Sequence, residues 1–250
     1  MELIRHTLIR GLLAALLLTS AACTGRLLPG DPPPCPRCFE NTEKAMIMDG
    51  SPGEPMTVVY NDTDEGNAVL RAANAPVNPD DPVVEHLIKR MLASVNVDKG
   101  VGIAAPQVGI NRQVVLVQRL DITPQQPFVS YLNPEITEYS KETAIGWEGC
   151  LSIPAGFGKV RRSTAITVAW DGEDGKRHSE HIEGFVAVIF QHEIDHLNGT
   201  LFIDRMESTM LVPKEEYRRL RQQEKEAEKQ AEQQAPKATE TAPEGKGDAK

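Results

Sequence analysis

Residues 183–199 read EGFVAVIFQHEIDHLNG, and this stretch decides both the centre of the fold and its chemistry. Its first half is almost continuously apolar, which predicts a central helix, and the closing NG is a typical helix end. Residues four apart share one face of a helix, so His192 and His196 can bind the same metal ion. Glu193 projects beside them, where a carboxylate can take a proton from a water molecule at the metal.

The same pattern would also fit a polar, solvated helix face. Here, however, the polar residues follow the apolar run FVAVIF at 185–190, so they would be buried. Each buried polar group without a partner costs roughly 1–3 kcal/mol. This cost makes a metal site the better interpretation.

Two histidines do not complete a metal site, and Cys150 in GWEGCLSIP (146–154) is the best third ligand. A lone cysteine is more often an inert buried residue. Cys150, however, is flanked by Glu148, Gly149 and Ser152, a polar setting with a tight backbone. The remaining histidines lie in the N-terminal segment, on a predicted surface helix and in a charged stretch: His6, His86, His178 and His181.

A third stretch, GVGIAAPQVG at 100–109, is rich in small residues. No GK[ST] and no acidic residue on a following strand supports a nucleotide loop. Small residues such as Gly102 instead let a substrate backbone lie close to the chain. Gln107 would then offer an amide donor to a developing oxyanion.

In this order, GVGIAAPQ, EGCLS and QHEIDHLNG resemble the three signature motifs of peptide deformylases, and the resemblance covers residues 56–212. It implies an α+β fold, with antiparallel sheets packed around the helix that carries HExxH, and a hydrolase that removes the formyl group from N-formylmethionyl peptides. Cys150, His192 and His196 would hold one divalent cation. Fe²⁺ is the family's usual ion, and Zn²⁺, Ni²⁺ or Co²⁺ are possible.

The resemblance also implies the roles of further residues. Glu193 would be the general base and then the proton donor to the departing amine. Gln107 and the backbone N–H of Leu151 would hold the oxyanion, and Glu148 would orient the site from behind the ligands. The substrate would lie against Gly102, Gly149, Arg161, Phe185, Val188 and Ile189, of which the last three would line the pocket for the methionine side chain.

The N-terminal residues predict export. A charged start (Arg5, Arg10) and the apolar run GLLAALLLTSAA predict a signal peptide over residues 1–22, too short to span a membrane. Ser20-Ala21-Ala22-Cys23 resembles a lipoprotein cleavage site, which would place a lipid anchor on Cys23, although Ser-x-Ala also suits ordinary cleavage. A start at Met46, Met48 or Met56 would instead give a cytosolic protein.

The residues on either side of the catalytic part have unusual compositions. Residues 23–55 are rich in proline and glycine, which predicts a tether, and Cys35 and Cys38 within it predict a local disulfide or, less well, half a zinc site. Residues 213–250 predict a charged helix followed by a polar tail. Strands are expected at 56–60, 113–120 and 165–170, and a helix at 82–95.

Charge and composition limit the partners. The 250 residues carry a net charge of −9, which argues against nucleic-acid binding, and residues 214–232 hold equal numbers of basic and acidic side chains. We expect a monomer that acts on formylated peptides. Two alternatives stay open: a metal-dependent amidase or peptidase with another substrate, and a non-catalytic surface protein that binds formylated peptides. An intact Glu193 argues against the second, because a binding protein needs no base.

Overall fold

The computed structural model describes residues 35–97, 99–172 and 174–234. The predicted signal peptide, the lipid site at Cys23 and the polar tail after residue 234 lie outside these residues. The helices are α1 (Asn41–Met48), α2 (Asp64–Leu70), α3 (Pro82–Val97), α4 (Gly184–Leu197) and α5 (Lys214–Gln234), with short 3-10 helices at Ala105–Val108 and Phe202–Asp204. The strands are β1 (Gly102–Ala104), β2 (Val114–Gln118), β3 (Phe128–Tyr139), β4 (Thr143–Cys150), β5 (Ile153–Ser163), β6 (Ala165–Asp171) and β7 (Arg177–Glu183).

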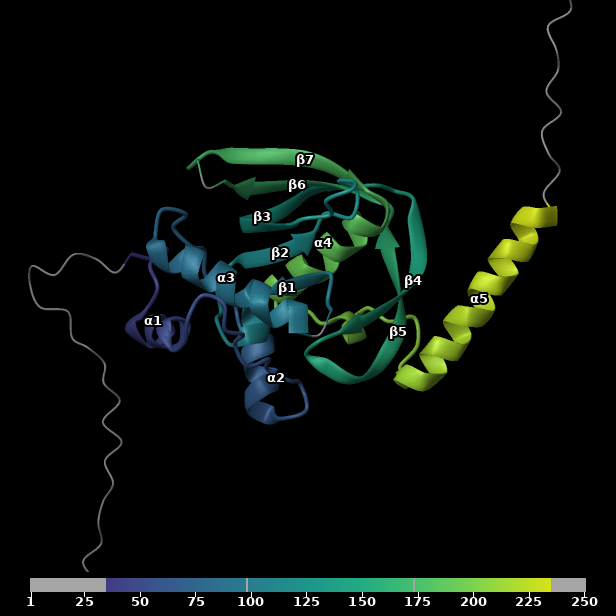
Figure 1. Cartoon of the computed structure of the whole chain (residues 1–250), viewed down its shortest axis with the longest axis horizontal. Coiled ribbons are helices and arrows are strands. Elements are labelled where there is room, and N and C mark those ends of the chain that lie inside the picture. The colour runs from purple at the N-terminus through teal and green to yellow at the C-terminus, as the bar shows by residue number, and fades with distance from the viewer. Residues whose placement is uncertain (1–34, 98, 173, 235–250) are drawn as a thin grey trace, which may run out of the picture. The chain divides into compact units, whose positions relative to one another are not determined.

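The strands form two antiparallel sheets (Figure 1). Five strands pair in the order β1-β2-β3-β6-β7, and β4 and β5 form a separate two-stranded sheet. Helix α4 packs against β1 and β2 of the larger sheet. The predicted α+β class, with antiparallel sheets around the HExxH helix, is therefore confirmed.

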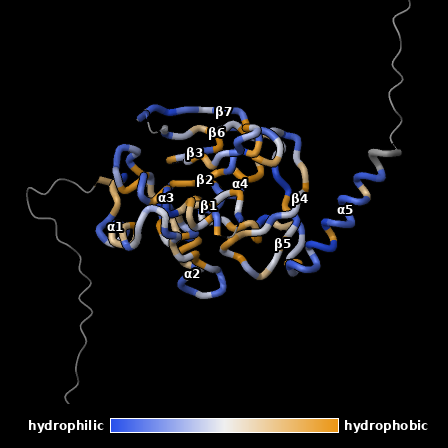
Figure 2. Tube along the Cα trace, viewed as in Figure 1, coloured by the Kyte–Doolittle hydropathy of each residue, from blue (hydrophilic) through white to orange (hydrophobic). Residues whose placement is uncertain are grey.

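Strand β2 carries apolar side chains on both faces, which explains its continuous run VVLV. Val115 and Val117 pack with α4 in one core cluster. Val114 and Leu116 point the other way, into a second cluster with α3. Figure 2 shows this concentration of apolar residues in the inner strands and α4, in contrast to the hydrophilic α5. The sheet thus holds α4 by one face and α3 by the other.

The helix expected at 82–95 and the strands expected at 113–120 and 165–170 are present as α3, β2 and β6. The strand predicted for Met56–Tyr60 is wrong, since no strand forms there. Its backbone N–H groups instead form single hydrogen bonds to other parts of the chain. The N–H of Met56 donates to the Ser94 hydroxyl, and the N–H of Val59 donates to the Gln107 carbonyl. None of the described strands pairs with this segment.

The predicted tether is also wrong for residues 35–55, which we call the N-terminal strap. Phe39 and Ile47 of the strap are buried in the same cluster as α3. Glu43 accepts hydrogen bonds from the buried guanidinium of Arg112, with Nε 2.7 Å from Oε1. The proline and glycine residues at the two ends of the strap suggested a tether, but helix α1 forms between them.

Two further features concern the cysteines of the strap and the length of the helices. Cys35 and Cys38 are free thiols whose side chains hydrogen-bond to each other, so the predicted local disulfide is absent from the structure. Among the described helices, none is both long and apolar enough to cross a membrane.

Candidate metal centre and active site

Helix α4 carries three of the predicted site residues on one buried face. His192, Glu193 and His196 are 9%, 4% and 1% exposed. The helix ends where the sequence predicted, with Asn198 as the C-cap and Gly199 at a φ of 65°, the left-handed conformation that glycine adopts most readily. The apolar residues before the motif fix this face against the sheet, so the polar side chains face inward.

Cys150 reaches the two histidines from the end of β4. Its Sγ lies 3.2 Å from Nε2 of His196, and one donor atom each of Cys150, His192 and His196 lie within 4.8 Å of one another. The pairing of β4 with β5 is irregular between Glu148 and Cys150, a distortion that re-aims side chains at sheet ends. The predicted ligand set is therefore brought together.

The donors fit a divalent transition-metal ion. One thiolate and two imidazoles are ligands that Zn²⁺ and Fe²⁺ accept. Burial lowers the pKa of His196 well below its ordinary value, which keeps the ring neutral and able to act as a ligand. Beside the cluster, Oε2 of Glu193 is buried and finds no hydrogen-bond partner among the described residues. A buried carboxylate oxygen in this position suits a water molecule at the cation.

Glu148 fixes the orientation of His192. Its Oε2 lies 2.8 Å from Nδ1 of His192, so Nδ1–H donates to the carboxylate and Nε2 is left for the cation. Burial would raise the pKa of Glu148, but hydrogen bonds from Arg162 and His192 outweigh it and lower the pKa to about 2. Glu148 is therefore a permanent anion behind the ligand.

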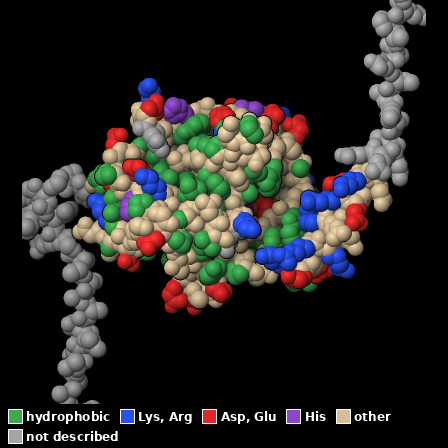
Figure 3. Space-filling view, viewed as in Figure 1, with side chains coloured by type: hydrophobic (Ala, Val, Ile, Leu, Met, Phe, Trp, Pro, Cys, Tyr) green, Lys and Arg blue, Asp and Glu red, His purple; other side chains and the backbone are tan. Residues whose placement is uncertain are grey.

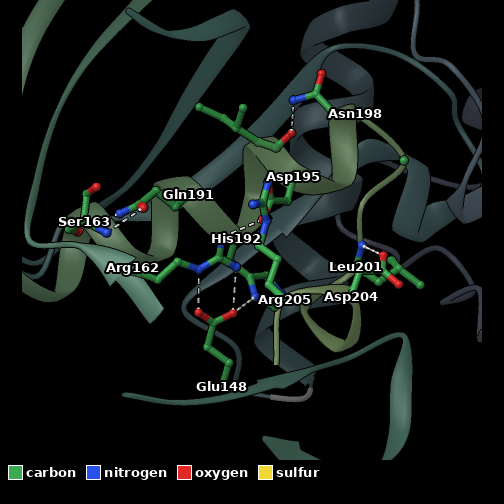
Figure 4. Close-up of polar contacts among 12 residues, drawn as sticks. Glu148, Arg162, Ser163, Gln191, His192, Asp195, Asn198, Leu201, Asp204 and Arg205 are labelled. Carbon is green, nitrogen blue, oxygen red and sulfur yellow. Dashed lines mark hydrogen bonds and ion pairs between the residues drawn. The ribbon is translucent and has the colours of Figure 1, made fainter. Parts of the chain in front are cut away.

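Arg162 binds this carboxylate and a second one (Figure 4). Its Nε and Nη2 lie 2.7 and 3.0 Å from the two oxygens of Glu148. Its Nη1 donates to Asp195 on α4, which also accepts two hydrogen bonds from Arg205. This buried group ties β4, β5 and α4 together around the metal ligands.

The sequence predicted Arg161 as a substrate-binding residue, and the structure does not support this. Arg161 is half-exposed, pairs with Glu207 at 3.1 Å and is not part of the cavity lining. Alternation along β5 explains the error: Val160 and Arg162 are buried, and Arg161 points outward between them. The apolar Val160 was the signal that could have identified Arg162.

Gln107 and Gly102 complete the site from the glycine-rich stretch. Oε1 of Gln107 accepts from the N–H of Ala104 at 2.8 Å, which directs Nε2 toward Cys150 at 3.4 Å from Sγ. Gly102 lies against Glu193 so closely that any Cβ there would collide with its carboxylate. Burial raises the pKa of Glu193 to about 7, a value suited to accepting and returning a proton near neutral pH.

These residues open into one cavity of about 630 Å³. Of the predicted residues, Gly102, Gln107, Glu148, Gly149, Cys150, Leu151, Phe185, Val188, Ile189, His192 and Glu193 line it. Trp147 and Phe157 from the small sheet, and Lys214 and Tyr217 from α5, also line it and were not predicted.

Comparison with known proteins agrees with this geometry. The model of the polypeptide deformylase family matches residues 58–211. The chain belongs to the polypeptide deformylase family. It is thus a hydrolase of formylmethionyl peptides that depends on one divalent metal ion, as the sequence predicted.

Similar proteins include peptide deformylase from Leptospira biflexa, 39% identical over 155 residues, which are 58% of this chain and 87% of that protein. Peptide deformylase 2 of a Nostoc species is 41% identical over 162 residues, which are 62% and 90% of the two chains. Among solved structures, the class I type b peptide deformylase from Acinetobacter baumannii bound to Met-Ala-Ser has a TM-score of 0.56 and 35% identity, covering 62% of this chain and 99% of that one. The peptide deformylase from Thermotoga maritima has the same TM-score, 37% identity and coverages of 62% and 99%. The N-terminal strap and α5 fall almost entirely outside the residues that match the family.

Proposed function

We propose that Cys150, His192 and His196 hold the divalent cation of the deformylase reaction. The observation that carries this proposal is the convergence of their three donor atoms within 4.8 Å, beside the buried Glu193. A cation held there supplies the Lewis acidity that makes water a nucleophile at neutral pH and polarises the formyl carbonyl.

The remaining steps belong to the chain's own residues. Glu193 takes a proton from the attacking water and returns it to the amine that leaves. Negative charge grows on the formyl oxygen, where Nε2 of Gln107 and the N–H of Leu151 donate hydrogen bonds. A single oxyanion donor of this kind contributes about 2.7–4 kcal/mol to the transition state.

The methionine side chain enters the part of the cavity lined by Phe185, Val188 and Ile189 of α4. These three residues lie on the helical turns before His192, and all three line the cavity. Their apolar surface suits an unbranched thioether.

Replacing the proposed base, Glu193, tests the proposed deformylase mechanism. The full chain should release formate from formyl-Met-Ala-Ser, and chelator should stop the release. Glu193→Ala should lower kcat at least a hundredfold, the lower end of what a general base contributes, while the bound metal, measured by elemental analysis, stays at the wild-type level. The exposed Glu138→Ala is the matched control and should retain activity.

Turnover of another amide with no release of formate would instead favour an amidase or peptidase. Metal and peptide binding without turnover of any amide would favour a binding protein. Full activity of metal-free protein would contradict the assignment altogether.

We also propose that the enzyme is exported and held at a membrane by a lipid on Cys23. The charged start, the apolar run and the cysteine after small residues support this. Iron(II) beside a thiolate is readily oxidised outside the cytosol, so we propose Zn²⁺ or another redox-inert ion in the site.

Both parts are tested on one preparation. Wild-type protein should sediment with membranes, and Cys23→Ser should be released into the soluble fraction. Elemental analysis of the membrane-derived protein should give zinc or another redox-inert ion. Soluble wild-type protein would contradict the lipid anchor, and iron as the sole metal would contradict the choice of ion.

A further inference from the structure

Helix α5 lies beyond the family match, which ends at residue 211, yet two of its residues line the substrate cavity. Lys214 and Tyr217 occupy its first turn, next to Trp147 and Phe157 of the small sheet. The helix is therefore part of this enzyme's active-site wall, although it lies outside the residues that match the family model.

Several contacts hold the first turn of α5 against the small sheet. Just before the helix, Val212 and Phe157 exchange two backbone hydrogen bonds, of 2.8 and 2.9 Å. Tyr217 then stacks on Phe157, with ring centroids 4.0 Å apart and planes 7° apart, and meets Trp147 edge-on. Glu224, two turns further on, accepts from the indole N–H of Trp147 at 3.1 Å.

This wall connects directly with the reacting centre. Phe157 packs so closely on Gly149 that a Cβ at that glycine would collide with its ring. Gly149 immediately precedes Cys150 and Leu151, a proposed ligand and a proposed oxyanion donor. A peptide whose formyl group lies at these residues thus has the aromatic wall beside it.

Charge is distributed unevenly in the cavity. At the proposed metal centre, the buried carboxylate of Glu148 is already paired with the buried Arg162. Two exposed lysines, Lys99 and Lys214, lie elsewhere in the lining, and neither forms an ion pair with any of the described residues. Figure 3 shows Lys and Arg side chains gathered over α5, but Arg218, Arg219 and Arg221 pair with glutamates of the same helix.

A formylated peptide matches this distribution. Formylation removes the charge of its amino end, and its free carboxyl end is negative. The two unpaired lysines of the cavity lining would attract that carboxylate, whereas the neutral formyl end gains nothing from them. The lysines therefore favour one direction of binding, with the carboxylate at the lysines and the formyl end at the proposed metal ligands.

We propose that α5 adds a subsite to the deformylase cavity, in which Tyr217, Trp147 and Phe157 contact the residues after formylmethionine and Lys214, with Lys99, binds a carboxylate of the peptide. This rests on the proposed function. The carboxylate is either the terminus of a short peptide or an acidic side chain of a longer one.

Substrate pairs that differ only in charge test the subsite. We compare kcat/KM for formyl-Met-Ala-Gln with a free carboxyl end, for the same peptide amidated, and for amidated formyl-Met-Ala-Glu. The wild-type enzyme should favour the free acid over its amide about two- to fivefold for each lysine that contacts it, the strength of an exposed ion pair. A preference for the glutamate peptide over amidated formyl-Met-Ala-Gln would show that an acidic side chain also serves.

Variants assign the effect to α5. Lys214→Gln and Lys99→Gln should each reduce the ratio of acid to amide, and the double variant should bring it close to one. Lys225→Gln, on the same helix but outside the cavity lining, should keep the wild-type ratio. Tyr217→Phe preserves the stacking on Phe157 and should keep the ratio, whereas Tyr217→Ala should lower it and raise KM.

Equal turnover of acid and amide by the wild-type enzyme, or a ratio that Lys214→Gln leaves unchanged, would overturn the subsite while leaving the deformylase assignment intact. Failure of the wild-type enzyme to release formate from any of the three peptides would instead overturn the proposed function.

Discussion

At the scale of single residues, Arg162 carries the largest structural role that the sequence motifs did not reveal. It is buried and forms ion pairs with two buried carboxylates, Glu148 and Asp195. Arg162→Ala would leave both anions without this partner, and breaking a buried pair in this way costs about 3–5 kcal/mol. We expect the free energy of unfolding, measured with urea, to fall by that amount. Metal affinity should fall about 10- to 100-fold, because the carboxylate of Glu148 that orients His192 would lose the guanidinium that anchors it.

The neighbouring arginine provides the control. Arg161→Ala removes an exposed pair with Glu207 and should change the free energy of unfolding by less than about 1 kcal/mol. Equal losses for the two variants would contradict the role assigned to Arg162.

These two residues also show what a sequence can reveal at this scale. Short motifs indicated the residues proposed as ligands, as base and as oxyanion donor, because such chemistry depends on residue type and local spacing. Arg162 acts through partners 14 and 33 positions away in the sequence, which no short motif encodes. The only local signal was the alternation after Val160, which places residue 162 on the buried face of β5 but does not name its partners.

At the scale of elements, one carboxylate of α5, that of Glu224, contributes to the docking of the helix on the small sheet. Hydrogen bonds from Arg221, Lys159 and Trp147 lower the pKa of Glu224 from 4.5 to about 2. A lowered pKa means that the undocked helix binds the proton more readily. Arg221 lies on α5 itself, so only the hydrogen bonds from Lys159 and Trp147 of the small sheet favour docking. Their contribution is fully present above pH 4.5 and is lost as the pH falls toward 2.

Tryptophan fluorescence measures this transition. In a Trp170→Phe background the emission reports Trp147, whose indole binds Glu224, and it should change over this acidic range. Glu224→Gln should remove this component of the pH dependence. An identical titration curve in both proteins would contradict the role of Glu224.

Helices and strands were predicted correctly where the hydrophobic periodicity of the sequence was strong. The prediction failed where the structure of a segment depends on which other segment it contacts. The continuous apolar run of α4 and the helical spacing of α3 required no knowledge of their neighbours. Met56–Tyr60 has the composition of a strand, but a strand exists only if another strand pairs with it, and here Ser94 and Gln107 bind the backbone instead. Likewise, the charged pattern of α5 predicted a solvated helix but not that Tyr217 would reach the cavity.

At the scale of the whole molecule, the N-terminal strap decides where the folded domain begins. The family match starts at residue 58, and the sequence resemblance suggested a domain from residue 56. In the structure, Phe39 and Ile47 fill the core beside α3, and Arg90 donates to the carbonyls of Met46 and Ile47. The stable unit therefore extends about one helix further than the catalytic motifs require.

A chain that begins at Met56 should accordingly be less stable than one that begins at Cys35. Loss of two fully buried apolar side chains, Phe39 and Ile47, removes about 3–6 kcal/mol. Arg112 would also lose its carboxylate partner Glu43, and an unpaired buried charge adds to the cost. Urea unfolding of the two chains, each with its metal, measures the difference. Equal midpoints would show that the strap only lies on the surface. A marked loss would mean that translation from Met46, Met48 or Met56 gives an incomplete core, which argues for synthesis from a start upstream of the strap and hence supports the proposed export.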